Sequence, residues 1–360
     1  MTAKPPSQSI KGRGAADSPQ GRFDGYVRER ESDSPGIEAN EEQRRPRTVI
    51  TLQEARSIIS RNDSPDVPFS QSINPYQGCE HGCIYCYARP SHAYLDLSPG
   101  LDFETKLFGK QNAAALLRKE LSAPGYRCEL IALAGNTDCY QPMERKLRIT
   151  RSILEVLSEF RHPVGIITKS SLIERDIDIL SAMARENLVH AFVSITSLDA
   201  ELSRTLEPRA AAPYRRLQVI ERLAAAGIPC GVLMAPVIPL INDKDLESVL
   251  EAAASAGATM AGYVVLRLPH EVKSLFRDWL SRHYPLRAAH VMARVNDLRG
   301  GRDYDSEFGS RMTGKGEYSE LIRARFAKAR ARFSLSNNDR FVLDTSKFRV
   351  PGRATQLGLF

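Results

Sequence analysis

The sequence has no run of eighteen apolar residues, so it contains no segment suited to cross a membrane as a helix. Its first twenty residues are polar and include Lys4, Lys11 and Arg13, which argues against a secretory signal. No short internal repeat is present, which argues against a solenoid. The 360 residues are 42% hydrophobic, enough to bury one large core with an appended segment. We therefore expect a cytoplasmic protein without a membrane anchor.

Cysteine is scarce but clustered. Three of the six cysteines, Cys79, Cys83 and Cys86, fall within eight residues, and no fourth cysteine lies near them. Three thiolates on one tight loop suit a [4Fe–4S] cluster that keeps one iron open. Gly78 and Gly82 allow the backbone to curl so that the three sulfurs point inward.

Two other interpretations of the cysteine loop are weaker. A structural zinc site normally has four ligands in two separated pairs, and here only His81 is available as a fourth ligand. A disulfide is unnecessary in a chain of this size, and thiolates stay reduced in the cytoplasm. The loop therefore favours an iron–sulfur cluster.

Beyond the loop, buried strands alternate with amphipathic helices. After a first strand near 70–74, strands are expected at 128–134, 164–168, 190–197, 230–237 and 260–266, and helices at 110–121, 146–160, 172–187, 214–226 and 243–256. This alternation predicts a parallel sheet of βαβ units. The fold class is α/β, a partial TIM-type (β/α)6 barrel.

The flanks of the barrel have a different composition. Residues 1–45 are predicted to be a disordered tail, and 46–69 a helical lead-in with a short helix over 51–61. The barrel takes 70–285, including a helix over 271–284 that carries Trp279. A basic helical extension with a helix over 317–333 follows at 286–350, and 351–360 form a flexible tail.

The net charge of +7 is concentrated near the C-terminus. Residues 294–353 contain fourteen Lys and Arg against eight Asp and Glu. A local excess of this kind is typical of a surface that binds a phosphate backbone. A solvated helix face is the other interpretation, and charge alone does not separate the two.

Polar residues follow the ends of successive predicted strands, where ligands bind in barrels of this kind. Each has an ordinary interpretation as a turn former, a sheet hydroxyl or a surface lysine. Their occurrence together at successive strand ends favours a binding site. The polar residues are Asn136 and Asp138, Lys169, and Ser194 and Thr196, and the fifth strand ends in the apolar Ala235.

With these motifs in view, residues 70–267 resemble the spore photoproduct lyase-like branch of the radical SAM superfamily. The cysteine loop, with Tyr85 before the third cysteine and Tyr87 after it, carries the likeness to the superfamily. The likeness to the branch and to an uncharacterised bacterial group within it rests on weaker motifs. They are Lys11–Ala15, 91–108, Asn136–Asp138, Thr168–Lys169, Phe192–Ile195, Leu206–Pro208 and Met234–Pro236.

The resemblance implies a radical SAM enzyme in which Cys79, Cys83 and Cys86 bind the cluster. The reduced cluster cleaves S-adenosylmethionine (SAM) and generates a 5′-deoxyadenosyl radical that abstracts hydrogen from the substrate. An electron donor of the flavodoxin or ferredoxin type is implied. For SAM itself, Lys169 suits the carboxylate and Asp138 with Asn136 the ammonium group. Ser194 and Thr196 are candidates for the ribose hydroxyls, and Tyr85 and Ala235 for the border of the adenine.

One position departs from the branch. Spore photoproduct lyases have a hydrogen-donating cysteine just before the equivalent of the Asn136 turn, and this chain has Gly135. Cys139 is a candidate replacement for that hydrogen donor, and a buried thiol that fills space is the other interpretation. Thymine-dimer reversal is therefore not carried over from the resemblance.

The last five residues, Gln356–Phe360, resemble the pentapeptide by which bacterial proteins dock on the DNA sliding clamp. Two leucines and a phenylalanine suit an apolar groove, and Gln356 suits a register contact. Packing of these residues back on the barrel is the alternative.

Three functions remain open from the sequence. The first is a DNA-acting radical enzyme, for instance in repair, which the basic region, the tail and the branch favour. The second is a radical SAM enzyme acting on a small molecule, protein or RNA. The third is a cluster-bearing DNA-binding or redox-sensing protein without catalysis.

Overall fold

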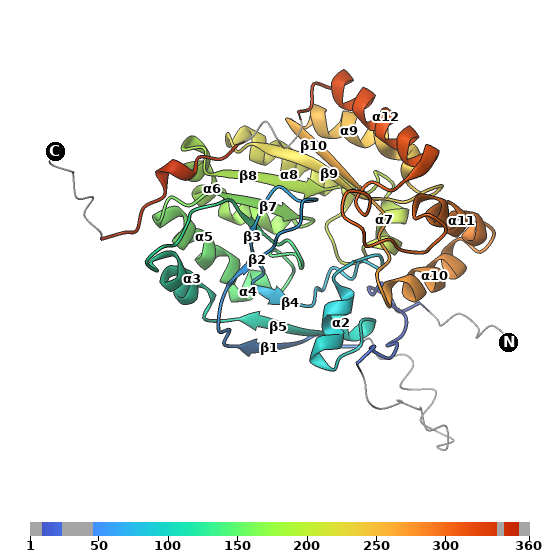
Figure 1. Cartoon of the computed structure of the whole chain (residues 1–360), viewed down its shortest axis with the longest axis horizontal. Coiled ribbons are helices and arrows are strands. Elements are labelled where there is room, and N and C mark those ends of the chain that lie inside the picture. The colour runs from blue at the N-terminus through green and yellow to red at the C-terminus, as the bar shows by residue number, and fades with distance from the viewer. Residues whose placement is uncertain (1–8, 24–45, 337–341, 353–360) are drawn as a thin grey trace, which may run out of the picture.

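Seven strands form the main sheet, in the order β10–β9–β8–β7–β6–β3–β2, in a computed structural model that describes residues 9–23, 46–336 and 342–352 (Figure 1). The edge strand β2 (Ile59–Arg61) pairs antiparallel with β3, and the other neighbours pair in parallel. This is the predicted (β/α)6 partial barrel. Its parallel strands are β3 (Gln71–Ile73), β6 (Ile131–Leu133), β7 (Val164–Thr168), β8 (Val189–Ser194), β9 (Cys230–Val237) and β10 (Met260–Val265).

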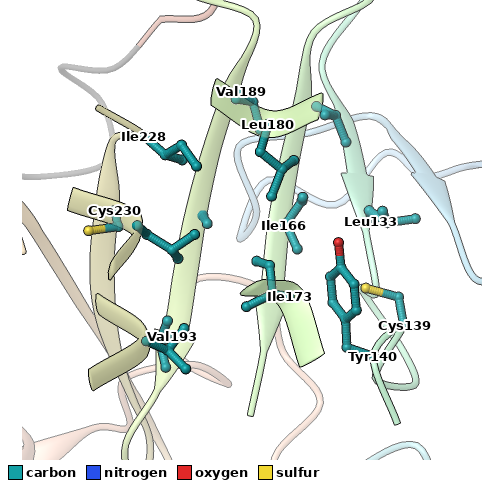
Figure 2. Close-up of a cluster of buried hydrophobic side chains, with 14 of the residues drawn as sticks. Leu133, Cys139, Tyr140, Ile166, Ile173, Leu180, Val189, Val193, Ile228 and Cys230 are labelled. Carbon is teal, nitrogen blue, oxygen red and sulfur yellow. The ribbon is translucent and has the colours of Figure 1, made fainter. Parts of the chain in front are cut away.

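Amphipathic helices connect these strands. In α5, for example, Ile153, Leu154 and Leu157 are fully buried in the core cluster that Figure 2 shows in part. Pro213 opens α8, and Gly227 and Gly257 follow α8 and α9 in the left-handed conformation that glycine tolerates. The connecting helices are α3 (Ala113–Leu121), α5 (Ile149–Glu159), α6 (Ile177–Arg185), α8 (Pro213–Ala225) and α9 (Leu246–Ser255).

A second sheet of three short strands lies apart from the main sheet (Figure 1). In it β5 (Lys106–Lys110) pairs in parallel with β1 (Val49–Gln53) and antiparallel with β4 (Tyr76–Gln77). The predicted helix over 51–61 is therefore wrong, because this stretch contributes to β1 and β2. The β-branched residues Val49, Ile50 and Thr51 favour a strand once a distant partner strand is present.

Residues 9–23 pack against the barrel, so the predicted disorder of 1–45 does not hold for this stretch. Asp17 accepts a hydrogen bond from the backbone of Leu101 at 3.1 Å, and Pro19 accepts one from Ser98 Oγ at 2.6 Å. Gly14 and Ala15 are buried. We call residues 10–19 the N-terminal strap.

The last barrel strand is followed by α10 (Val272–His283), and the C-terminal extension contains α11 (Ala288–Leu298) and α12 (Gly316–Arg332). Trp279 is fully buried, and α12 buries Ile322, Phe326 and Ala329. In the described part of the chain, each helix is too short or too polar to cross a membrane. The Gln356–Phe360 motif lies outside the described residues.

Candidate active site

A cavity of about 280 Å³ opens at the carboxyl ends of the barrel strands. All three clustered cysteines line it, and polar residues that follow β6, β7 and β8 face them. The remaining wall is mostly apolar. Its lining includes Cys79, His81, Cys83, Tyr85, Cys86, Asn136, Asp138, Lys169, Ser194 and Ala235, together with Val67, Phe69, Tyr87, Gly135, Val264, Val265, Arg267 and Met312. We call it the barrel cavity.

The cysteine loop turns tightly at two glycines. Gly78 and Gly82 both have positive φ, at 75° and 68°. Close neighbours add to this requirement, because a Cβ on Gly78 would lie 2.7 Å from the Leu107 side chain, and one on Gly82 would lie 2.8 Å from Glu104 Oε2. Larger residues at either position would force the loop away from its neighbours.

The three thiols are free and face one space, as a cluster site requires. Burial raises the pKa of Cys83 to about 12, and burial followed by the nearby negative charge of Asp138 raises the pKa of Cys79. A buried thiolate is therefore unfavourable until positive metal replaces its proton. Within the described residues no three His, Cys, Asp or Glu side chains form a site for a single metal ion. Thiolates that share a [4Fe–4S] cluster bind different irons, so three thiols spread around one cavity fit this group.

Asp138 organises the ends of β6 and β7. Its Oδ1 accepts hydrogen bonds from Thr168 Oγ1 and the Tyr140 backbone, both at 2.8 Å, and its Oδ2 accepts one from the Lys169 backbone at 2.7 Å. His81 Nδ1 lies 3.4 Å from Oδ2. Burial alone would raise the pKa of Asp138, but the His81 charge and these hydrogen bonds lower it to about 2. Asp138 is therefore a carboxylate that ties His81 of the cysteine loop to Lys169.

A buried ion pair lies beneath the cysteine loop. Glu207 follows α7 (Ala200–Leu206) and accepts hydrogen bonds from Tyr85 Oη and from the fully buried guanidinium of Arg216. Lys169 Nζ is 4.0 Å from Glu207 Oε1 and 5.9 Å from the centre of the Tyr85 ring. Burial would raise the pKa of Glu207, but the positive charges of Arg216 and Lys169 lower it. Lys169 is thus a cation at the cavity wall with only a long ion-pair contact.

Six of the predicted SAM-site residues share the barrel cavity with the cysteines. They are Tyr85, Asn136, Asp138, Lys169, Ser194 and Ala235.

Two predicted residues do not lie where expected. Thr196 is buried behind the end of β8 and is not among the cavity residues. Cys139 is fully buried in the hydrophobic core beside Tyr140 (Figure 2), and it too does not line the cavity. Its backbone carbonyl accepts a hydrogen bond from Thr150 Oγ1, which fixes this turn against α5. Of the two interpretations of Cys139, this placement favours the buried thiol that fills space.

No role was predicted from the sequence for Glu207, Arg216 or Arg267. Glu207 stands in the Leu206–Pro208 motif, and an acidic residue in such a motif was a usable signal. Arg216 lies in an amphipathic helix, and Arg267 follows the last barrel strand, so neither position is distinctive in the sequence. Only the three-dimensional arrangement shows that Arg216 contacts Glu207 and that Arg267 lines the cavity.

The fold and the three-cysteine cavity define a radical SAM protein. The family model of the Radical SAM superfamily matches residues 73–253. The chain belongs to this superfamily and is a radical SAM enzyme.

Similar proteins come from distant organisms. Uncharacterised proteins of Mycobacterium tuberculosis and Mycobacterium bovis are 35% identical over 312 residues, which cover 85% of this chain and 88% of theirs. An uncharacterised protein of Methanocaldococcus jannaschii is 26% identical over 214 residues, covering 59% of this chain and 76% of that one.

Among solved structures, the fold matches spore photoproduct lyase. A mutant with bound AdoMet and dinucleoside spore photoproduct has a TM-score of 0.56, at 15% identity and 82% coverage of both chains. A second structure, complexed with dinucleoside spore photoproduct, has a TM-score of 0.55 at 16% identity and covers 80% of this chain and 81% of that one. These likenesses establish a common fold.

The cofactors are accordingly a [4Fe–4S] cluster and SAM, and the reaction class requires an electron donor. When bound, the cofactors supply the radical chemistry, and the protein positions the reacting groups and excludes water. In this chain, the buried pair beneath Tyr85 and the Asp138 contacts hold the cysteine loop against the ends of β7 and β8.

Replacing Glu207 by Gln removes the negative charge between Arg216 and Lys169. We expect a loss of about 3–5 kcal/mol in the free energy of unfolding, because a buried guanidinium is left without its counter-charge. Urea titration under anaerobic conditions measures this loss. Glu159→Gln is the matched control, since the Glu159–Arg118 pair is exposed and should contribute less than about 1 kcal/mol. Equal losses in the two variants would contradict the importance of the buried pair.

Proposed function

We propose that this radical SAM enzyme abstracts hydrogen from a nucleotide unit of DNA bound in the barrel cavity beside Tyr87 and Arg267. The observation that carries the proposal is the pairing of an accessible aromatic ring with a cation at that place. Tyr87 is 44% exposed, and the Arg267 guanidinium lies 5.0 Å from the centre of its ring. Aromatic rings stack on nucleobases and guanidinium groups bind phosphate, so the two together suit a nucleotide.

Arg267 has only weak partners in the described structure. Its guanidinium approaches Met312 Sδ at 3.6 Å and Tyr304 Oη at 3.3 Å, its Nε has no hydrogen-bond partner, and no ion pair to it occurs among the described residues. Neighbouring Arg299 adds positive charge, and burial followed by repulsion from Arg267 lowers the pKa of Arg299 to about 10. A partly buried cation in an apolar wall is stabilised by an anionic ligand.

The choice of DNA is also supported by the shared fold, because spore photoproduct lyase binds a dinucleoside photoproduct. The proposal does not extend to reversal of that lesion. Gly135 stands at the position of the donor cysteine, and Cys139 is held in the core.

The positive charge of helix α12 is not part of the evidence for this proposal, because the helix leads away from the cavity. It starts after Met312, which lines the cavity, and ends before Ser336, which pairs with Met260 at the beginning of β10. The helix therefore leads from the carboxyl ends of the strands toward their amino ends. Its exposed cations Arg323, Lys328 and Arg332 extend away from the cavity, as a solvated helix face does.

One observation favours the alternative, a substrate smaller than DNA. Asp66 accepts hydrogen bonds from the Gly309 backbone at 2.6 Å and from Arg311. It thereby joins the loop containing Val67 and Phe69 to the loop containing Met312, both of which wall the cavity. A small molecule, or one residue of a protein or RNA, fits behind loops joined in this way.

For SAM, we propose that Lys169 binds the carboxylate and that Asn136 binds the ammonium group. Asp138 lines the cavity beside Asn136 and joins it at the ammonium group, and it positions Lys169 by accepting a hydrogen bond from the Lys169 backbone. Ser194 is placed for a ribose hydroxyl, and Tyr85 and Ala235 for the adenine border. The proposed electron donor is of the flavodoxin or ferredoxin type, and the proposed location is the cytoplasm, where the thiolates stay reduced.

We also propose that Gln356–Phe360 docks on a sliding clamp. The last described segment supports this placement, because Phe348 packs edge-on against His162, which precedes β7. The described chain therefore passes the amino ends of the strands shortly before it stops at Gly352. A partner bound there leaves the cavity open.

Replacing Lys169 by Met keeps an unbranched side chain but removes the charge. We expect SAM affinity to fall about tenfold or more, since a charge-assisted hydrogen bond contributes about 1.5–3 kcal/mol. Isothermal titration of the reconstituted enzyme measures this change, with the brown absorbance of the cluster as a check on the site. Lys119→Met, an exposed lysine on α3, is the control. Unchanged SAM affinity in the Lys169 variant would reject the assignment.

DNA binding should depend on salt and on Arg267. With SAM bound, we expect the logarithm of the affinity for a labelled duplex or damaged oligonucleotide to fall linearly with the logarithm of the salt concentration. Arg267→Gln should weaken binding and reduce the slope by about 1. Fluorescence anisotropy measures both, and Arg61→Gln, an exposed residue on edge strand β2, is the control. A flat salt response, or no effect of Arg267→Gln, favours the smaller substrate.

Deletion of Gln356–Phe360 should abolish co-purification with the bacterial sliding clamp while leaving SAM cleavage unchanged. The tail has apolar side chains suited to a clamp groove, and the described residues that line the barrel cavity belong to other parts of the chain. Pull-down with purified clamp and release of 5′-deoxyadenosine are the two measurements. Clamp binding that survives the deletion would reject the docking proposal.

A further inference from the structure

The N-terminal strap contacts the outer side of the cysteine loop. Gly14 lies so close to Gly82 that a Cβ added to Gly14 would be 1.8 Å from the Gly82 carbonyl oxygen. Ala15 is fully buried in a cluster that includes Cys83 and Ile84. The strap therefore fits directly against the backbone between the first and second cluster ligands.

Glu104 connects the strap to the loop. Its carboxylate is fully buried and accepts hydrogen bonds from the Gly14 backbone at 3.0 Å and the Ala15 backbone at 2.8 Å. The same carboxylate pairs with the fully buried guanidinium of Arg89. Arg89 in turn donates to the carbonyls of Cys83 at 2.9 Å and Gly82 at 3.2 Å. A continuous chain of charge-assisted hydrogen bonds thus runs from the strap to two carbonyls of the loop.

Arg13 secures the strap from its other side. Its guanidinium donates to the Glu104 backbone carbonyl at 2.9 Å and to Thr48 Oγ1 at 3.0 Å. Thr48 Oγ1 donates to Glu80 Oε1 at 2.6 Å, and Glu80 lies in the cysteine loop. The strap therefore holds the loop both at Glu80 and at Gly82–Cys83.

We propose that Arg13–Ala15 is a positioning element of the iron–sulfur centre, with Glu104 and Arg89 as its positioning residues. Bound to Glu104, the strap holds the cysteine loop in the shape that presents three thiolates and closes its outer side to water and oxygen. This inference rests on the superfamily's cluster and is independent of the proposed substrate. Residues that support metal ligands from behind commonly change metal retention about ten- to hundredfold when they are replaced.

The test uses Gly14→Ala in the full-length protein, reconstituted anaerobically. The added methyl group must push the strap off Gly82, so we expect the cluster to be lost in air about tenfold faster than in the wild type. The decay of the brown absorbance, and the iron and sulfide content after gel filtration, measure this loss without reference to activity. Arg13→Gln, which adds no bulk, should shift both measurements in the same direction.

The control separates positioning from general stability. A Cβ on Gly231 would lie 2.6 Å from the Phe192 ring, so Gly231→Ala strains the barrel at a position remote from the strap. The rate of cluster loss in each variant is compared with the decrease in its midpoint of thermal unfolding. For the same decrease in that midpoint, Gly14→Ala should lose its cluster faster than Gly231→Ala. The proposal would be overturned if the rate of cluster loss depended only on the decrease in the thermal unfolding midpoint. It would also be overturned if Gly14→Ala and Arg13→Gln retained the cluster as long as the wild type does.

Discussion

Two buried arginine–glutamate pairs hold the cysteine loop, and the arrangement of the site depends on them. Arg89 and Glu104 fix the loop on its outer side through the carbonyls of Gly82 and Cys83. Arg216 and Glu207 fix it at Tyr85, where Glu207 accepts a hydrogen bond from the Tyr85 hydroxyl. Buried ion pairs contribute little net stability compared with apolar packing, but each partner is strongly destabilising when left alone. We interpret these pairs as determinants of the loop's shape.

The same constraint explains how residues far apart in the chain reach one cavity. Glu207 follows α7, and its contact with Tyr85 joins the fourth βα unit to the cysteine loop. Asp138 makes the equivalent connection from the second unit, because it binds both His81 and the Lys169 backbone. The loop is therefore fixed to several strand ends, and its thiols keep their place although no regular secondary structure contains them. Such contacts give the preorganised surroundings that a reactive cofactor requires.

Local sequence patterns were sufficient to predict the barrel and most of its cavity. Continuous apolar runs mark buried parallel strands, and the spacing of the cysteines is itself a chemical signature. The errors have physical causes. The strand Val49–Gln53 forms because it pairs with Lys106–Lys110, which lie far away in the sequence. The N-terminal strap is ordered because Gly14 fits against Gly82. Neither the strand nor the ordered strap can therefore be predicted from its own residues alone. Cys139 and Thr196 follow strands as expected of site residues, but the direction of a side chain in a turn is set by contacts such as Thr150 with the Cys139 carbonyl.

The two ends of the barrel are chemically different, and this bears on the charged C-terminal region. The carboxyl ends of the strands present the thiols, Lys169 and Arg267 to one cavity. At the amino ends, α12 finishes beside Met260 and Phe348 covers His162. Most of the net positive charge of the sequence belongs to residues 294–353, yet Arg325 of this region is paired with Glu247, and the exposed cations of α12 lie along a helix that leads away from the cavity. Two different surfaces would thus serve a polyanionic substrate. The charged C-terminal region would attract it over a distance, because attraction needs only net charge. The barrel cavity would recognise the reacting unit, because recognition needs a guanidinium beside an aromatic ring.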